Sequence, residues 1–276
     1  MGCSSSSSST KALLSSIKSL IDSDNSYGLS LLLKQEILIH NASGLINSLR
    51  ISHLHYKFSL LDYSLFTNKP KCFVTLLKTF KFCPISLVQS FHSQSLDPAI
   101  ALCEMAALEI LETFFPLYLE AFKAGLFKLK EKTPLEVACE QGHINIVSYL
   151  LNTHKKMASK LTDIQHINSS GLNMTAVALL AGKYSCFKFV AQKSNKIVGL
   201  GDPISECLEK SLLKTGNEYQ ECVVYLVQNL DYRVSQNHID KTSNSSIFNQ
   251  FLYKKFNEQC ADKDSTSSVS TSLGSF

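Results

Sequence analysis

Apolar residues recur along this chain in groups of four at positions i, i+1, i+4 and i+5, the spacing of one face of an α-helix. First members stand at 72, 110, 146, 186 and 222, so successive groups are 38, 36, 40 and 36 residues apart. The five groups are Cys72, Phe73, Leu76 and Leu77; Ile110, Leu111, Phe114 and Phe115; Ile146, Val147, Leu150 and Leu151; Cys186, Phe187, Val190 and Ala191; and Cys222, Val223, Leu226 and Val227. A near-constant step of this length predicts one helical unit repeated along the chain.

The segments outside these groups also have helical spacing. Residues 11–21 predict a short helix, and 29–39 and 43–51 predict two more; the last includes a weaker apolar group, Leu45, Ile46 and Leu49. Near the C-terminus, 247–256 has an aromatic-rich helical face, which predicts either a cap on the last repeat or an exposed partner-binding helix. No run alternates with period two over a useful length, so the chain is predicted to be nearly all helix.

One copy, at residues 133–151, shows how such a unit folds. Thr133 can cap a helix, and Pro134 suits the first turn, where its missing N–H costs nothing. Ala138 is small, as close packing of two helices requires, and Gly142 can take the positive φ that ends the first helix. A helix–turn–helix unit is therefore predicted.

Thr133 to Leu151 resembles an ankyrin repeat. The matching residues are Thr133, Pro134, Leu135, Ala138, Gly142, His143, Val147, Leu150 and Leu151, with Glu136 where His is commonest. Asp97-Pro98, with Ala106 at the Gly position, opens a second copy at 97–115, and 171–191 fits a third. The copies at 59–77 and 203–227 fit less well, and the latter has Glu218 where Gly is expected. The resemblance implies an all-α, ankyrin-type helical-repeat solenoid of about five to six helix–turn–helix repeats.

Two other repeat classes have similar periods. Tetratricopeptide repeats need Trp and Tyr signatures, and the chain has no Trp. HEAT-like repeats suit steps of 36 to 40 residues but leave Thr-Pro-Leu with Gly-His unexplained. Ankyrin repeats step by about 33 residues, so the extra residues of each copy are placed in the connections.

These patterns divide the chain into four predicted parts. Residues 1–27 form a Ser-rich arm and a short helix, and 28–232 form the repeats. Residues 233–260 form a C-terminal capping region, and 261–276 form a disordered Ser-rich tail.

The first residues, Met1-Gly2-Cys3 and a serine run, fit the pattern for N-myristoylation. Removal of Met1 exposes the Gly2 amine, and Cys3 beside it suits a palmitoyl chain. Two acyl chains anchor a protein stably, whereas one is marginal. The other interpretation is a Ser-rich tail in which Gly2 is accidental.

Composition narrows the class of protein. Of 276 residues 45% are hydrophobic and only 18% are charged, and the formal charge of +4 is too mild to predict nucleic-acid binding. Nine Cys without a C-x-x-C pair favour a reducing cytosol over a secreted disulfide scaffold. No apolar run is long enough to span a bilayer, and no signal peptide is evident.

The sequence lacks the common motifs of catalytic and metal sites. It contains no P-loop, no G-x-S-x-G, no H-E-x-x-H and no Cys/His cluster with ligand spacing. Cys72, Cys186 and Cys222 stand in the apolar groups, where Cys acts as a small hydrophobe. No catalytic residue, metal or cofactor is predicted.

The connections between copies are rich in lysine. Equivalent connections meet at one edge of stacked repeats, so these lysines are predicted to form a basic edge facing an acidic partner or an anionic membrane; the alternative is that they only keep long loops soluble. The basic edge comprises Lys123, Lys128, Lys130, Lys132, Lys155, Lys156 and Lys160. Lys78, Lys81, Lys193 and Lys196 lie in further connections.

The predicted function is a non-enzymatic adaptor or scaffold that binds another protein, held at the cytoplasmic face of a membrane by its N-terminal lipids. Two alternatives are a soluble host-directed or viral interaction protein without an anchor, and a regulatory subunit or enzyme whose activity lies in the degenerate ends.

Overall fold

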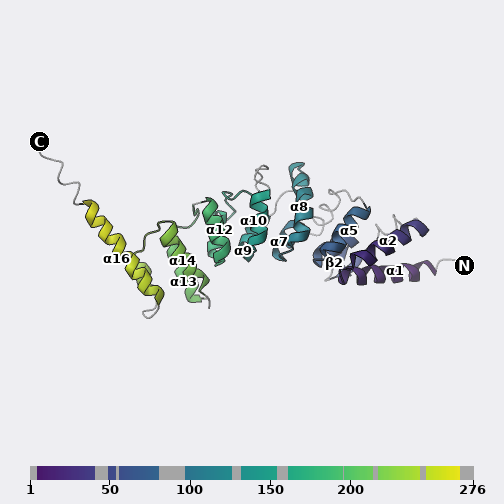
Figure 1. The fold of residues 1–276 in the computed structure, drawn as a ribbon, viewed down its shortest axis with the longest axis horizontal. Coiled ribbons are helices and arrows are strands. Elements are labelled where there is room, and N and C mark those ends of the chain that lie inside the picture. Colours follow the sequence, from purple (N-terminus) through teal and green to yellow (C-terminus); the bar gives the residue numbers. More distant parts are fainter. Residues whose placement is uncertain are drawn as a thin grey trace. The chain divides into compact units, whose positions relative to one another are not determined.

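The computed structural model describes residues 5–40, 49–53, 56–80, 97–125, 132–153, 161–194, 196–213, 217–242 and 247–267. Nearly all of them lie in helices and the turns that join them, with one two-stranded antiparallel hairpin (Figure 1). The chain divides into two compact units, Met1–Pro134 and Leu135–Phe276, and the division falls at the start of one helix, α9.

The N-terminal unit consists of helix pairs packed side by side. Helix α1 packs on α2, α4 on α5 and α7 on α8, while α2 contacts α5, and α5 contacts α8. The strands β1 and β2 pair antiparallel, with Ile51 opposite Phe58. The elements are α1 (Ser5–Asp22), α2 (Ser26–His40), β1 (Ile51–His53), β2 (Tyr56–Phe58), α4 (Leu60–Phe66), α5 (Pro70–Phe80), α7 (Pro98–Glu104) and α8 (Leu108–Lys123).

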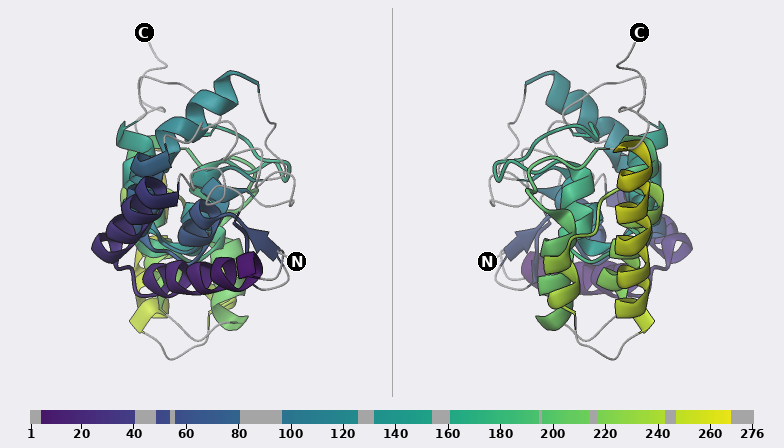
Figure 2. Two further views of the ribbon diagram at one scale, coloured as in Figure 1. Left: turned by 90° about the vertical axis from the view of Figure 1, so that its right-hand side faces the viewer. Right: turned by 90° about the vertical axis from the view of Figure 1, so that its left-hand side faces the viewer.

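The C-terminal unit continues the same construction. Within it α11 packs on α12, α13 on α14 and α15 on α16, and successive pairs contact first helix to first helix and second to second. Helix α16 is the yellow helix in the right-hand view of Figure 2. The elements are α9 (Pro134–Gln141), α10 (Ile144–Thr153), α11 (Met174–Leu180), α12 (Tyr184–Ser194), α13 (Pro203–Leu213), α14 (Glu218–Asn229), α15 (Gln236–Asp240) and α16 (Ile247–Ser267).

The five apolar groups form the cores of the two units. They lie on α5, α8, α10, α12 and α14, and every member except the half-buried Leu77 is buried. Burying a Leu, Val or Phe side chain contributes about 1.5–3 kcal/mol. The repeated group is therefore the main source of stability in each pair.

The turn inside each of four pairs has the same geometry. Backbone N–H groups donate to the carbonyl five residues earlier, at Ser64, Leu102, Ala138 and Ala178, which repeats the spacing of the apolar groups. The residue before each donor has a positive φ: Asn68 (52°), Ala106 (56°), Gly142 (81°) and Gly182 (69°). This is the left-handed cap that closes an α-helix with a reversal of the chain.

Helices α1 and α2 form a further pair of this kind. The N–H of Asn25 donates to Leu20 O across the turn, and Asp24 has a φ of 50°. The Tyr63 hydroxyl donates to Asp22 Oδ1 at 2.6 Å, and Cys72 N donates to Asp24 Oδ1 at 3.0 Å. These bonds attach the pair to α4 and α5.

Several predicted boundaries differ from the structure. The boundary after residue 27 divides the α1–α2 pair, and α1 begins at Ser5, because the serine run extends the helix expected over 11–21. Ile51, expected to end a helix, lies in β1, and Leu45 and Ile46 lie outside the described residues. Helix α16 extends to Ser267, seven residues into the segment expected to be disordered, and residues beyond it are not described. In the described part of the chain, no helix is long and apolar enough to cross a membrane.

Candidate functional site

In four pairs the first helix starts at a residue whose side chain accepts backbone N–H bonds. Ser59 caps α4, Asp97 caps α7, Asn173 caps α11 and Asp202 caps α13, with donor–acceptor distances of 3.0–3.2 Å. Thr133 holds the equivalent position before α9 and is buried. Capping residues satisfy N–H groups that the helix leaves free. They also fix the point at which each connection meets its helix.

The connection between α10 and α11 is held by Asn168. Its Oδ1 accepts the N–H groups of Ser170 and Leu172 at 3.0 Å, and its Nδ2 donates to Glu136 Oε1 at 2.7 Å. Glu136, the residue that replaces the commonest His of the repeat motif, is only 3% exposed. A buried carboxylate requires such partners, so Glu136 ties the connection to α9.

Asn173 holds the next connection, between α12 and α13. Its Nδ2 donates to Lys196 O at 2.8 Å, and its Oδ1 accepts the Val198 N–H at 3.2 Å. Its own N–H donates to Val198 O at 3.2 Å. Gly199 then passes so close that a Cβ there would lie 2.1 Å from Gly171 O. The two connections are therefore packed directly on each other.

A hollow of about 510 Å³ lies on this side of the C-terminal unit. One wall is Lys196–Val198 and the other is Leu230–Arg233, which follows α14. We call it the connection hollow. Lys196, Asp231 and Arg233 are exposed, whereas Ile197, Leu230 and Tyr232 are half-buried. Burial raises the pKa of Tyr232, so its phenol stays protonated.

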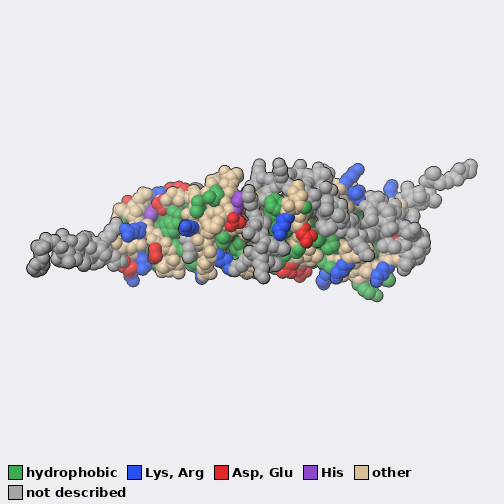
Figure 3. Space-filling view, turned by 90° about the horizontal axis from the view of Figure 1, so that it is seen from above, with side chains coloured by type: hydrophobic (Ala, Val, Ile, Leu, Met, Phe, Trp, Pro, Cys, Tyr) green, Lys and Arg blue, Asp and Glu red, His purple; other side chains and the backbone are tan. Residues whose placement is uncertain are grey.

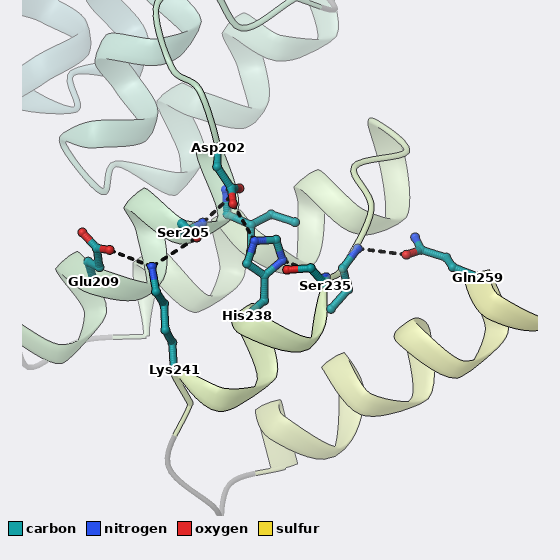
Figure 4. Close-up of polar contacts among 9 residues, drawn as sticks. Asp202, Ser205, Glu209, Ser235, His238, Lys241 and Gln259 are labelled. Atoms are coloured by element: carbon teal, nitrogen blue, oxygen red, sulfur yellow. Dashed lines mark hydrogen bonds and ion pairs between the residues drawn. The ribbon is translucent and has the colours of Figure 1, made fainter.

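A second polar cluster joins α15 to α13 (Figure 4). His238 Nε2 lies 2.6 Å from Asp202 Oδ2, and His238 Nδ1 lies 3.0 Å from the Ser235 backbone N. Because Nδ1 must accept the Ser235 N–H, the proton is on Nε2 and is donated to Asp202. Both ring nitrogens are occupied and the side chain is 4% exposed. His238 is therefore a structural clamp and is not placed to act as a general base.

The cluster extends on both sides of the clamp. Lys241 Nζ reaches Glu209 Oε1 at 2.7 Å and Ser205 Oγ at 3.3 Å. On the other side Gln259 of α16 accepts the Val234 N–H at 2.9 Å. Burial opposes ionisation of Asp202, but hydrogen bonds from His238 and Ser205 outweigh it and lower the pKa of Asp202.

The cysteines in the helix pairs are poor nucleophiles. Burial raises the pKa of Cys186 to about 11 and the pKa of Cys72 and Cys207 to about 12. Burial also raises the pKa of Cys103 and Cys222. Since the thiolate is the reactive form, these residues act in packing. Among the described residues, no group of three His, Cys, Asp or Glu side chains could hold a metal ion.

The predicted site residues fall into three groups. Of the repeat signature, Thr133, Pro134, Leu135, Ala138, Val147, Leu150 and Leu151 are buried and Gly142 and His143 are half-buried. Of the basic edge, Lys123 and Lys132 are exposed, and Lys128, Lys130, Lys155, Lys156 and Lys160 lie outside the described residues. Gly2 and Cys3 lie outside them too. The basic edge and the acylation sites therefore remain predictions.

Surface charge is mixed on the one face of the described residues that Figure 3 shows. On the face shown in Figure 3, Lys and Arg side chains are interspersed with Asp and Glu, and no large patch of one sign is visible there. Interactions of this surface with a partner must therefore depend on small groups of charges.

Comparison with known proteins identifies the fold. No protein-family model matches the sequence, and no curated protein is significantly similar to it. Among solved structures, the ankyrin repeat domain of human ASB11 is similar, with a TM-score of 0.52 and 13% sequence identity over 87% of this chain and 96% of that one. The fold is of the ankyrin-repeat type.

The likeness confirms the predicted helical-repeat fold class. At 13% identity the likeness shows the fold alone. Ankyrin-type repeats are typically non-enzymatic protein-interaction modules. Sequence reading missed Asn173 and Asp202 as holders of the connections, although both stand where Thr133 stands and are good capping residues.

Proposed function

We propose that this protein is a non-enzymatic adaptor that binds another protein through its ankyrin-type repeats. The observation that carries the proposal is the capped first helices and tied connections of the C-terminal unit, exemplified by Asn173 and Asn168. A surface that is already ordered loses little conformational entropy when it binds. Fold alone does not establish function, so the proposal needs a direct test.

We further propose that N-terminal acylation at Gly2 and Cys3 holds the protein at the cytoplasmic face of a membrane. Helix α1 begins at Ser5, and Asp22 and Asp24 at its far end bond to Tyr63 and Cys72. Lipids on Gly2 and Cys3 would therefore be joined to the N-terminal unit through a very short segment.

Metabolic labelling with alkynyl myristate and palmitate in a eukaryotic cell tests the anchor. We expect Gly2→Ala to lose both labels and to leave the membrane fraction, and Cys3→Ser to lose only palmitate. Gly201→Ala is the matched control, because a Cβ there meets nothing within 4 Å. A wild-type chain that takes up neither label would remove the anchor from the proposal.

The basic edge is proposed as a second membrane contact. Lys123 and Lys132 are exposed, and a contact with the membrane surface requires exposed side chains. Flotation of the unacylated chain with phosphatidylcholine vesicles, with and without phosphatidylserine, tests it. Each Lys near an anionic surface contributes about 1 kcal/mol. Equal binding to both vesicle types would leave the lysines with a solubilising role only.

A further inference from the structure

The connection hollow has walls whose backbone is already held in place. Asn173 bonds to Lys196 O and Val198 N on one wall. On the other wall Tyr232 N donates to Leu226 O at 3.2 Å, and Tyr232 O accepts from Gln259 Nε2 at 3.4 Å. These bonds come from the N-cap of α11, from α14 and from α16, so the hollow does not need a ligand to define its shape. A preformed hollow is typical of binding sites.

The connection hollow is lined by both apolar and charged side chains. Ile197, Leu230 and Tyr232 provide half-buried apolar surface, while Lys196 and Arg233 stand exposed at the two walls. Neither the Lys196 ammonium nor the Arg233 guanidinium forms an ion pair with any residue that the structure describes. By contrast, Lys18, Lys241 and Lys255 each have a carboxylate within 2.7 Å.

One acidic residue, Asp231, also lines the connection hollow. Asp231 has a φ of 53°, a left-handed conformation that costs most residues about 1–2 kcal/mol and that Asp and Asn tolerate best. Its carboxylate leaves the hollow with a net charge of +1, from two cations and one anion. A ligand with a single carboxylate matches this charge, whereas a run of carboxylates would meet Asp231.

We propose that the connection hollow binds an extended segment of a protein partner that presents one carboxylate beside an apolar side chain. The apolar side chain packs on Ile197, Leu230 and Tyr232, and the carboxylate bonds to Arg233, whose planar guanidinium suits bidentate contact, or to Lys196. This inference rests on the proposed interaction function and names the chemistry of the partner.

Selection of a displayed random heptapeptide library on the immobilised full-length chain tests the proposal. We expect enriched peptides to carry one Asp or Glu next to Leu, Ile or Phe. Binding of the best peptide, synthesised with a fluorescent label, is then measured by fluorescence polarisation. Its affinity should fall as salt is raised, because exposed charge pairs are screened.

Variants locate the binding site. Lys196→Gln with Arg233→Gln should weaken the selected peptide about threefold to tenfold, because the double substitution removes both cations that can pair with its one carboxylate. Asp231→Asn keeps a residue suited to positive φ and should strengthen binding severalfold. Lys254→Gln is the matched control, because this exposed cation lies on α16 outside the hollow and should leave binding unchanged. All four side chains are exposed, so thermal unfolding should stay close to that of the wild type.

Three results would overturn the proposal: no enriched peptide, enriched peptides without an acidic residue, or an affinity unaffected by the double substitution. The last two would leave the general interaction function standing, because the peptides would still bind elsewhere on the chain. The acylation experiment is independent of all three.

Discussion

The residues that adopt a positive φ in the turns between paired helices differ in the conformational free energy that this costs them. Gly takes a positive φ freely, Asn takes it with little strain, and Ala does so at a cost of about 1–2 kcal/mol. Gly142 and Gly182 therefore suit the turn, whereas Ala106 is strained at a φ of 56°. The sequence predicted where these turns lie because the turns recur along the chain with the same spacing as the apolar groups.

Gly182→Ala should destabilise the C-terminal unit by about 2 kcal/mol. The new Cβ would lie 2.6 Å from Cζ of the Tyr219 ring, which is buried and donates its hydroxyl to Leu180 O. Gly125→Ala is the control, because its φ of 71° is similar but a Cβ meets nothing within 4 Å, so only the backbone cost of about 1 kcal/mol applies.

Conversely, Ala106→Gly should stabilise the N-terminal unit by up to about 1 kcal/mol, because Gly takes the positive φ without strain. Urea unfolding measures all three, and equal losses for the two Gly→Ala changes would contradict the Tyr219 contact.

Thr175→Val should stabilise the protein by about 1 kcal/mol. Thr175 occupies the position of Leu135 in its copy, is fully buried, and its Oγ1 has no hydrogen-bond partner among the described residues. A buried hydroxyl without a partner costs about 1–3 kcal/mol, which Val removes while keeping the shape. Thr175→Ser, which keeps the hydroxyl and loses the methyl, should destabilise. A loss of stability in the Val variant would show that the hydroxyl has an unseen partner.

The helices and strands differ in how easily they can be predicted from the sequence. The second helices were predictable because four apolar positions at i, i+1, i+4 and i+5 leave little choice of face. Helix α15 is five residues long and is held by the His238 and Lys241 side chains, whose partners Asp202 and Glu209 are more than 30 residues away. No local pattern reveals such contacts. The hairpin of β1 and β2 was missed for a similar reason, because three-residue strands are too short to show alternation.

His238→Ala should lower the free energy of unfolding by about 2 kcal/mol, because it removes two hydrogen bonds and leaves the Ser235 N–H without its acceptor. Hydrogen exchange should accelerate most in α15 and α16. Gln236→Ala is the control, since its bond to Asp240 on the same helix is exposed. Equal effects of the two variants would rule out the clamp.

The clamp also gives stability a dependence on pH. The pKa of Asp202 is lowered in the fold, so its carboxylate stabilises the protein fully above about pH 4, the usual pKa of an unfolded Asp. That contribution disappears as pH falls through the lowered value. We expect Asp202→Asn to be less stable than wild type by under about 1 kcal/mol at pH 7, with a smaller difference at pH 2. Unfolding at both pH values checks this, and a difference that grows in acid would have the wrong sign.

At the scale of the whole molecule, stability is the sum of each pair's own packing and its contacts with its neighbours. The chain divides into two units at the start of α9, so a local loss should be felt mainly within one unit. The sequence predicted the repeated pairs and missed this division, because the copy at 133–151 has the sharpest motif and gives no sign of a boundary.

Hydrogen exchange followed by mass spectrometry tests the division. Gly182→Ala should accelerate exchange throughout 135–267 by about tenfold or more, as expected for a loss of about 2 kcal/mol. The N-terminal unit, 5–125, should change by less than about threefold. Uniform acceleration along the chain would mean that the two units unfold as one.

The bond from Asn168 to Glu136 bears on the chemical ageing of the protein. Asn168 is half-buried and stands before Ser169 in an irregular, largely exposed segment, and Asn is among the thermolabile residues. Hydrolysis of its side-chain amide would replace the donor Nδ2 with an oxygen and set two carboxylates against each other at a contact now 2.7 Å long. A change of about one mass unit would thereby release the connection from α9, and old preparations would lose the order of this connection without losing any peptide bond.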